Sequence, residues 1–430
     1  MICSNLTDRM NKGRVCTLLL LMAAAGIFTA CGKEQQTENE QYGTIQEESR
    51  EAGTSQTISD QFGEGQSIDD IEATTDNNEG AAGTAVDEAD ITKNAQTDEL
   101  KNRFGENCIS EQTFEVELSE YEGKVWFVPY APAEDGQALD MQIIQDGEIL
   151  TRIYTDVPES LEGQPFTSLD AVSFFDVNYD GCTDIVVIET YGDASFAEIY
   201  YGFANDGSDY VSSFISYDSF SERITKRVGN LTISEIRKFL SDGKKNGEFN
   251  DYKEAYRAIV RWSEVAFDSE LTYDLIYFDD DDIPELVFGY KGYWVSMYTY
   301  YDGKACMLMD HWAYGAMGNA GYEYIPRGNR LRNYNNDYAG LICYTTYMTI
   351  SEQHALDVVT VITTYNFDDV NGNGMPDEDE MDSAGSYGAI YVGGEEITYE
   401  QYAEYDAGEY EYIVGSMNLE ELTDTLVQTN

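Results

Sequence analysis

Two hydrophobic spacings alternate along the chain from about residue 114 onward. The first consists of short runs rich in β-branched and aromatic residues, such as "KVWFVPY" (124–130) and "MQIIQDGEILTRIY" (141–154), and it predicts strands. Asp146-Gly147, inside the second run, suits a two-residue hairpin turn, as do two later pairs, Asp206-Gly207 and Asp302-Gly303. Similar runs lie at 273–278, 284–290, 293–309, 340–350 and 355–367. Antiparallel hairpins are therefore expected over most of this region.

The second spacing is helical. The stretch "DYKEAYRAIVRWSEVAF" (251–267) places Tyr256, Ile259 and Val260 on one face, with Asp251 as the predicted N-cap. Before it, Thr232 or Ser234 could cap "ISEIRKFL". The stretches 398–408 and 418–426 predict short C-terminal helices.

These patterns predict an α+β, β-rich fold with two antiparallel β domains joined by a helical segment. We expect β-rich domains at 98–228 and 269–430, with a helical connector at 229–268. A weak internal repeat supports two related β units, because "FFDVNYDGCTDIVVIETYG" from Phe174 and "IYFDDDDIPELVFGYKG" from Ile276 share one pattern. Two copies are too few for a closed propeller.

The N-terminus has the layout of an export signal. Arg9, Lys12 and Arg14 precede the short apolar run "CTLLLLMAAAGIFTA", which ends in small residues before Cys31. The stretch "FTACG" resembles the lipobox of bacterial lipoproteins, with Phe at a position where the family prefers Leu. The resemblance implies a signal peptide over 1–30, lipidation of Cys31 and an anchor in the bacterial cell envelope. The alternative is an ordinary cleaved signal with an incidental cysteine.

The composition of the chain limits the classes of partner that it could bind. Residues 31–97 are polar and acidic with almost no aromatics, so they are expected to form a disordered tether. The whole chain has 81 acidic and 25 basic residues, a formal net charge of −56. Such a polyanion is not expected to bind nucleic acid, whose phosphates require Lys and Arg. Divalent cations are its natural counter-ligands.

One acidic loop runs from Asp176 to Asp184 and is followed by the predicted strand Ile185–Ile188. It reads D-x-N-x-D-G-x-x-D, with side-chain ligands expected at positions 1, 3, 5 and 9 and a main-chain carbonyl at position 7. It resembles the calcium loops of FG-GAP and VCBS repeats, which run straight into a strand. The resemblance implies Ca²⁺ binding by the side chains of Asp176, Asn178, Asp180 and Asp184 and the carbonyl of Cys182. The alternative is an Asx-rich turn without metal.

A second stretch, "DVNGNGMPDEDE" from Asp369, fits the EF-hand loop pattern D-x-[DN]-x-[DN]-G-x₅-E. It resembles EF-hand and dockerin loops and the calcium repeats of thrombospondins. Its flank reads as strand, however, and Pro376 removes an N–H, so the resemblance extends to the loop and not to helix–loop–helix. Two Asn in place of Asp lower its charge and its expected affinity. The implied ligands are Asp369, Asn371, Asn373, Met375 through its carbonyl, Asp377 and Glu380.

A third acidic loop is degraded. In register with the first, Tyr277 replaces the first acid and Asp282 replaces the glycine. Asp279, Asp281 and Glu285 remain as candidate ligands. We therefore expect two Ca²⁺ sites, with a third left open.

Four cysteines lie outside the signal region: Cys108, Cys182, Cys306 and Cys343. Free thiols and one or two disulfides are both compatible with an exported protein, and Cys306–Cys343 is the pairing to test first.

The segment 310–340 combines aromatics, amides and Arg with glycines. Trp312, Tyr314, Tyr322, Tyr324 and Arg327 could line a groove for a glycan or peptide, or simply form sheet core and turns. The sequence contains no H-E-x-x-H, Cys/His cluster or G-x-S-x-G, and no catalytic residue is predicted. The preferred hypothesis is a lipid-anchored, calcium-binding surface protein with a structural or ligand-binding role. A carboxylate-dependent envelope hydrolase and a glycan- or peptide-binding module of an uptake system are the alternatives.

Overall fold

The computed structural model describes residues 97–133, 139–155, 157–203, 214–267, 270–290, 292–314, 319–381, 384–385, 388–413 and 415–427. All of them belong to one compact unit. The predicted signal peptide, the lipobox cysteine Cys31, the tether and the turn Asp206-Gly207 lie outside the described residues.

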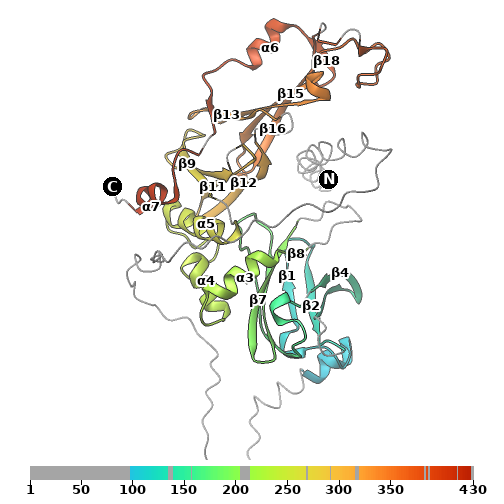
Figure 1. The fold of residues 1–430 in the computed structure, drawn as a ribbon, viewed down its shortest axis with the longest axis vertical. Helices are drawn as coiled ribbons and strands as arrows, with labels where there is room; N and C mark the ends of the chain where they lie inside the picture. The colour runs from blue at the N-terminus through green and yellow to red at the C-terminus, as the bar shows by residue number, and fades with distance from the viewer. Residues whose placement is uncertain are drawn as a thin grey trace, which may run out of the picture. The chain divides into compact units, whose positions relative to one another are not determined.

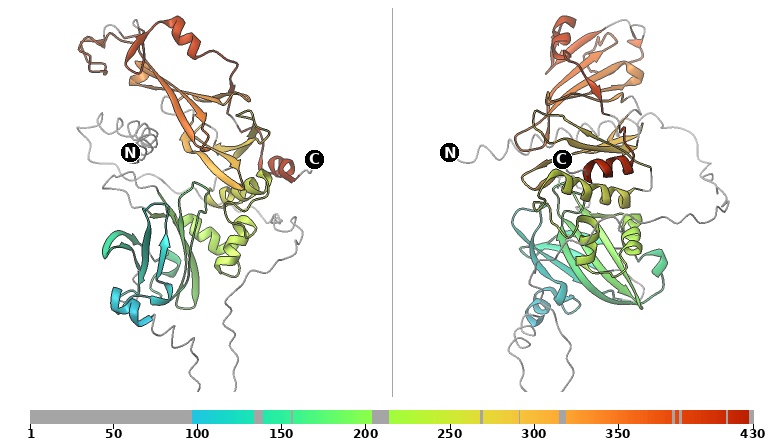
Figure 2. Two further views of the ribbon diagram at one scale, coloured as in Figure 1. Left: turned by 180° about the vertical axis from the view of Figure 1, so that it is seen from behind. Right: turned by 90° about the vertical axis from the view of Figure 1, so that its left-hand side faces the viewer.

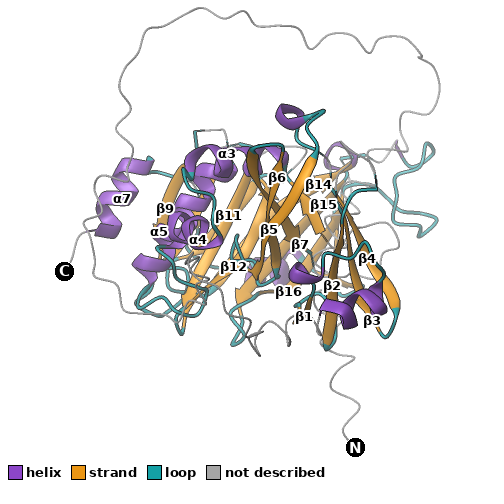
Figure 3. Cartoon of the chain, turned by 90° about the horizontal axis from the view of Figure 1, so that it is seen from below, coloured by secondary structure: helices purple, strands orange, loops and turns teal. Residues whose placement is uncertain are grey.

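The fold is α+β and rich in antiparallel sheet, as the sequence predicts (Figures 1 and 3). The first sheet has the order β1-β2-β3-β4 and the second β5-β6-β7-β8. Their strands are β1 (Phe114–Glu117), β2 (Lys124–Tyr130), β3 (Asp140–Gln145), β4 (Glu148–Tyr154), β5 (Phe166–Phe175), β6 (Asp184–Tyr191), β7 (Ala194–Gly202) and β8 (Phe214–Ser216). Helices α3 (Asp218–Arg227), α4 (Ile233–Ser241) and α5 (Tyr252–Ala266) follow. The short 3₁₀ helices are η2 (Ser110–Gln112), η3 (Glu159–Leu161) and η4 (Tyr338–Gly340).

Two further sheets complete the described part. A four-stranded sheet has the order β12-β11-β10-β9, and a seven-stranded sheet has the order β18-β17-β16-β15-β14-β13-β19. The strands are β9 (Thr272–Ile276), β10 (Glu285–Tyr290), β11 (Trp294–Tyr301), β12 (Lys304–Ala313), β13 (Gly321–Ile325), β14 (Arg330–Asp337), β15 (Ile342–Ile350), β16 (Leu356–Tyr365), β17 (Ala389–Val392), β18 (Glu395–Ile397) and β19 (Glu411–Tyr412). The C-terminal helices are α6 (Tyr399–Tyr405) and α7 (Leu419–Val427).

The sheets and helices share three main cores. Ile185 and Val187 of β6 pack in a core between β1–β4 and β5–β8, while Val186 and Ile188 face a core formed with α3, α4 and α5. That helical core continues onto one face of β9–β12. The other face of β9–β12 packs against β13–β16. Both faces of β6 and β10 are thus covered, which explains why these strands read as continuous apolar runs. Figure 2 gives two further views of these layers.

Several local predictions are confirmed. Asp146 and Gly147 both adopt positive φ (52° and 85°) between β3 and β4, as do Asp302 and Gly303 (46° and 78°) between β11 and β12. This is the backbone of a two-residue turn that matches strand twist. Asp251 caps α5 by accepting from the Glu254 N–H. Thr232, rather than Ser234, caps α4.

Helix α3 was not predicted. Its ten residues lie within the stretch assigned to the first β domain, and they bury only Phe220, Ser221 and Ile224. So short an apolar face gives little periodic signal, and its packing against β7 and α5 supplies what the sequence pattern lacks.

Candidate metal-binding loops

Loop 1 (176–184) connects β5 to β6 and folds around its first aspartate. The two carboxylate oxygens of Asp176 accept the main-chain N–H groups of Asp180 (3.2 Å) and Gly181 (3.0 Å). Tyr179 and Gly181, at positions 4 and 6, both have positive φ (63° and 87°). These two left-handed residues turn the chain so that the side chains at positions 1, 3 and 5 lie on the same side.

The acid at position 9 closes loop 1. Asp184 is fully buried and accepts from the N–H of Val177 at 2.6 Å and of Gly202 at 2.9 Å. It therefore joins the start of the loop to the first residue of β6 and to the end of β7.

Loop 1 also contacts segments that are distant in sequence. The Asn246 side chain donates to Asp176 at 3.5 Å and to the carbonyl of Ala305 at 3.1 Å. The Tyr298 hydroxyl donates to the carbonyl of Asn178 at 3.0 Å. On another side, the carboxylate of Glu120 accepts from the Thr183 N–H at 2.8 Å. These partners were not predicted, because nothing in the local sequence around an isolated Asn, Tyr or Glu signals a contact 60 to 120 residues away.

Burial and mutual repulsion raise the pKa values of the loop 1 carboxyls. Burial, and then the charge of Asp180, raises the pKa of Asp176 to about 7. Burial likewise raises the pKa of Asp180, and burial with the charges of Asp180 and Asp176 raises the pKa of Asp184 well above its usual range. Carboxylates crowded in this way are stabilised in their charged form by a bound cation.

Loop 3 (369–380) repeats the backbone arrangement of loop 1. Asp369 accepts from the N–H groups of Asn373 (3.1 Å) and Gly374 (3.0 Å). Gly372 and Gly374 occupy positions 4 and 6 with φ of 70° and 73°. These contacts correspond position by position to those of Asp176, although the two loops connect strands of different sheets and differ in sequence.

Two further acids organise loop 3. Glu380, at position 12, is buried and accepts from the N–H groups of Val370 (2.9 Å) and Asp377 (3.2 Å). Asp377 accepts from the side-chain amides of Asn371 (2.6 Å) and Asn373 (2.9 Å). Asn371, Asn373 and Met375 are exposed, so this loop is more open to solvent than loop 1.

Loop 2 (277–285) keeps only part of the arrangement. Glu285 is fully buried and accepts from the N–H of Phe278 at 2.9 Å, in the place that Asp184 has in loop 1. Asp279 and Asp281 accept from main-chain N–H groups two residues ahead, as their counterparts in loop 1 do. Burial, with a contribution from the charge of Asp279, raises the pKa of Glu285 to about 8. The left-handed residues at positions 4 and 6 are missing, however.

Arg327 occupies the mouth of loop 2. Its guanidinium donates to the carbonyl of Asp281 at 2.9 Å and lies 3.5 Å from the Asp282 carboxylate. It also lies over the ring of Tyr277, 4.5 Å from the centroid. Arg327 thus brings a positive charge to the acids of loop 2. The first position of this loop is Tyr277, whereas loops 1 and 3 begin with an aspartate.

The donor sets of loops 1 and 3 suit Ca²⁺. They consist of carboxylate and amide oxygens with a carbonyl at position 7, and their backbone turns as the pattern requires. Within the described residues, no group of three or more His, Cys, Asp or Glu side chains is arranged to hold a metal ion. Several carboxylate oxygens of the loops instead accept loop N–H groups, so ion binding would draw on amide and carbonyl oxygens and on local side-chain movement.

The aromatic segment 310–340 is largely built into a core. Tyr322 and Tyr324 are buried between β9–β12 and the seven-stranded sheet. Trp312 and Tyr314 are half-buried, and their rings lie 5.8 and 6.5 Å from that of Tyr322. Arg327 is the exposed member and belongs to loop 2.

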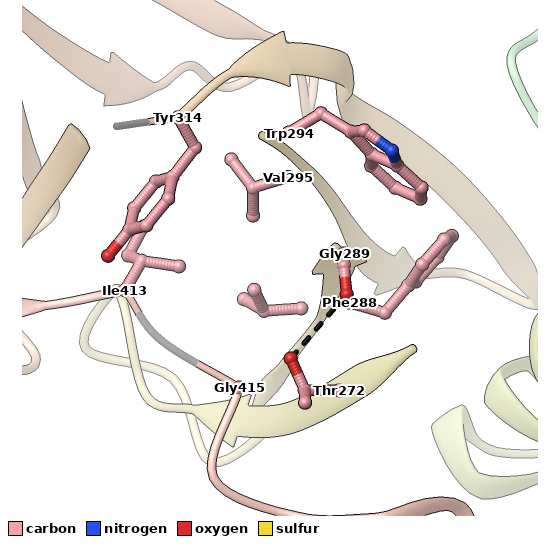
Figure 4. A pocket seen from close by; sticks show the side chains of 9 residues that line it. Thr272, Phe288, Gly289, Trp294, Val295, Tyr314, Ile413 and Gly415 are labelled. Carbon is pink, nitrogen blue, oxygen red and sulfur yellow. Dashed lines mark hydrogen bonds between the residues drawn. The ribbon is translucent and has the colours of Figure 1, made fainter. Parts of the chain in front are cut away.

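A small hollow lies beside this segment (Figure 4). Tyr314, Trp294, Phe288 and Ile413 surround it, and the Thr272 hydroxyl donates to the carbonyl of Gly289 at 3.5 Å. It has room for about one water molecule. No carboxylate lines it, so it does not supply the paired acids of a glycosidase.

Cys306 and Cys343 are not joined by a disulfide, so the structure does not contain the pairing that the sequence suggested testing first. Cys108 is buried and its sulfur lies 3.2 Å from the Thr113 hydroxyl.

No protein-family model matches the chain, and no curated protein sequence matches it. Among the described residues, no helix combines the length and the apolar character needed to cross a membrane.

Proposed function

We propose that this chain is an exported, lipid-anchored surface protein whose fold is stabilised by Ca²⁺ bound in loops 1 and 3, and whose role is structural or ligand-binding. The observation that carries the calcium part is the shared geometry of the two loops. In both, the first aspartate accepts the N–H groups of positions 5 and 6, and positions 4 and 6 are left-handed. Similar sequence spacing and similar backbone geometry thus occur together in two unrelated strand connections.

The contacts around loop 1 indicate how a bound ion would stabilise the fold. Its residues contact β11 through Tyr298 and β12 through Asn246, and Val177 and Tyr179 belong to the helical core. An ion that orders the loop would stabilise all of these contacts. It would also neutralise the crowded, half-buried charges of Asp176 and Asp180.

Thermal unfolding in EDTA and in Ca²⁺ tests this proposal. Extracellular modules bind Ca²⁺ with a Kd of about 10⁻⁴ to 10⁻³ M, so the titration should reach about 10 mM. At ten times Kd, each site should add about 1.4 kcal/mol to the free energy of unfolding. Asp176→Asn and Asp369→Asn should each remove part of this gain. Asp279→Asn in loop 2 is the matched control and should leave it unchanged. A Tm that is the same in EDTA and in Ca²⁺ would rule the proposal out.

The anchor rests on the sequence around Cys31 and is tested separately. The wild-type chain, expressed in a bacterium, should fractionate with membranes and partition into detergent. Cys31→Ala should release it into the soluble fraction. Equal partitioning of both proteins would contradict lipidation at Cys31.

A further inference from the structure

A second group of acids lies far from the loops, on the face of β5–β8 that packs against β1–β4. Glu189 is in β6 and Glu198 is in β7. Glu198 pairs with Val187 and Glu189 pairs with Phe196, so the two acids are diagonal neighbours on one face of the sheet. Val187 and Tyr200, on the same face, belong to the core between the two sheets.

Both carboxylates are buried without a basic partner. Glu189 is 2% exposed and Glu198 is 5% exposed. Neither forms an ion pair with a Lys, Arg or His side chain of the described residues. Placing charges of one sign in a core is costly unless an opposite charge or a proton compensates.

Three buried oxygen atoms of this cluster have no hydrogen-bond partner: Oε1 of Glu189, the hydroxyl of Tyr200 and Oγ of Ser216. Tyr200 is 1% exposed and lies opposite Ser216 in the β7–β8 pair. Both hydroxyls lie close enough to the Glu198 carboxylate to lower its pKa, although neither meets the geometry of a hydrogen bond. Tyr191 donates to the other oxygen of Glu189 at 2.7 Å, which fixes the orientation of that carboxylate.

No hydrogen bond joins the two carboxyl groups, so one shared proton does not bridge them. The available donors are all oxygens, which favours a hard cation. Two carboxylates balance one double positive charge. From this cluster we infer that Glu189 and Glu198, with Tyr200 and Ser216, form a buried site for a divalent cation such as Mg²⁺ or Ca²⁺, independent of the acidic loops.

Protons compete with the cation at this site. Burial raises the pKa of Glu189 to about 7, and burial with the charge of Glu189 raises that of Glu198 to about 8. Affinity for the cation should therefore rise between pH 6 and pH 8, as the carboxyls ionise.

The test is isothermal titration of the full chain with Mg²⁺ and, separately, with Ca²⁺ at pH 8, after removal of metal. Wild type should bind one more equivalent than the double variant Glu189→Gln/Glu198→Gln. Asp193→Asn, an exposed carboxylate on the same hairpin, should bind as wild type does. In EDTA at pH 8 the double variant should unfold at a higher temperature than wild type, because it removes buried carboxyls that ionise near that pH.

Tyr200→Phe gives a second, charge-neutral readout. It should weaken binding of the same equivalent by at least about tenfold, since even outer-shell changes at metal sites cost about 10- to 100-fold. If the double variant does not fold, this variant decides alone. Equal stoichiometry in wild type and the double variant, or unchanged affinity in Tyr200→Phe, would overturn the inference and leave two protonated carboxylic acids in the core. Either result leaves the loop sites untouched, because their equivalents are retained in both variants.

Discussion

The hydroxyl of Tyr298, in strand β11, donates a 3.0 Å hydrogen bond to the main-chain carbonyl of Asn178, in loop 1. The two residues are 120 positions apart, and the Tyr298 side chain is fully buried. A neighbouring main-chain bond from Met307 to the carbonyl of Tyr179 reinforces this contact. Loop 1 is thus held from outside by the sheet β9–β12 as well as by its own turns.

Tyr298→Phe should destabilise the protein by about 1 to 3 kcal/mol, because it leaves the buried carbonyl of Asn178 without its donor. Denaturant unfolding at fixed Ca²⁺ measures the loss. Tyr300→Phe is the matched control, since that hydroxyl also donates to a carbonyl, that of Phe249, at a less buried position. Its loss should stay below about 1 kcal/mol. Equal losses of unfolding free energy in the two variants would mean that the bond to Asn178 contributes no more than an ordinary, less buried tyrosine hydrogen bond.

The pH dependence of stability should differ with and without Ca²⁺. Burial raises the pKa of Asp176 from 3.8 to about 7, so without metal the folded state binds more protons than the unfolded state. Stability without metal should therefore fall as pH rises from about 4 to 7. Urea unfolding in EDTA over this range should show the decline, and saturating Ca²⁺ should reduce it, because the ion favours the charged carboxylate. Asp176→Asn should make this decline in EDTA smaller, although other buried carboxyls with raised pKa values keep part of it. A stability that rises over this range in EDTA would contradict the account.

Gly181→Ala should strain loop 1, because Gly181 has a φ of 87°. A left-handed conformation costs an L-residue about 1 to 2 kcal/mol. No atom lies within 4 Å of the added Cβ, so a steric clash does not add to this cost. Thermal unfolding and Ca²⁺ titration should both register the loss. Gly229→Ala, where φ is not positive and space is also open, should be neutral or slightly stabilising.

Asp406→Ala should release helix α6 from the seven-stranded sheet. One oxygen of Asp406 accepts from Arg332 (2.8 Å), Tyr334 (3.0 Å) and Tyr347 (2.8 Å). Losing this shared acceptor should cost about 2 to 4 kcal/mol in denaturant unfolding. Glu222→Ala, which breaks the exposed pair with Lys226, should cost no more than about 0.5 kcal/mol. Similar small losses in both would show that the Asp406 contacts do not hold α6.

The sequence predicted most strands because their apolar runs and Asp-Gly turns are local signals. It also predicted the sharp glycine turn at position 6 of loops 1 and 3, because the spacing of Asp, Asn and Gly is a local signal. In loop 2, the substitution of Tyr277 and Asp282 correctly indicated a departure, but the contribution of Arg327 depends on the fold.

Burial of Glu189 and Glu198 could not be predicted. A charged residue in a strand ordinarily marks the solvent-facing side, and "DIVVIETYG" gives no sign that Glu189 faces another sheet. The rings of Trp312, Tyr322 and Tyr324 give the opposite case. They were candidates for an exposed groove, but they are half-buried or buried between sheets. Aromatic composition alone does not distinguish a binding groove from a core between sheets.

The most direct test of the calcium loops is the number of Ca²⁺ ions bound by wild type compared with Asp176→Asn/Asp369→Asn, measured by isothermal titration of the metal-free full chain. Wild type should bind two more equivalents than the double variant, and its Tm should rise with Ca²⁺ while that of the double variant should not. Equal numbers of bound ions in the two proteins, or no heat of binding in wild type, would contradict it.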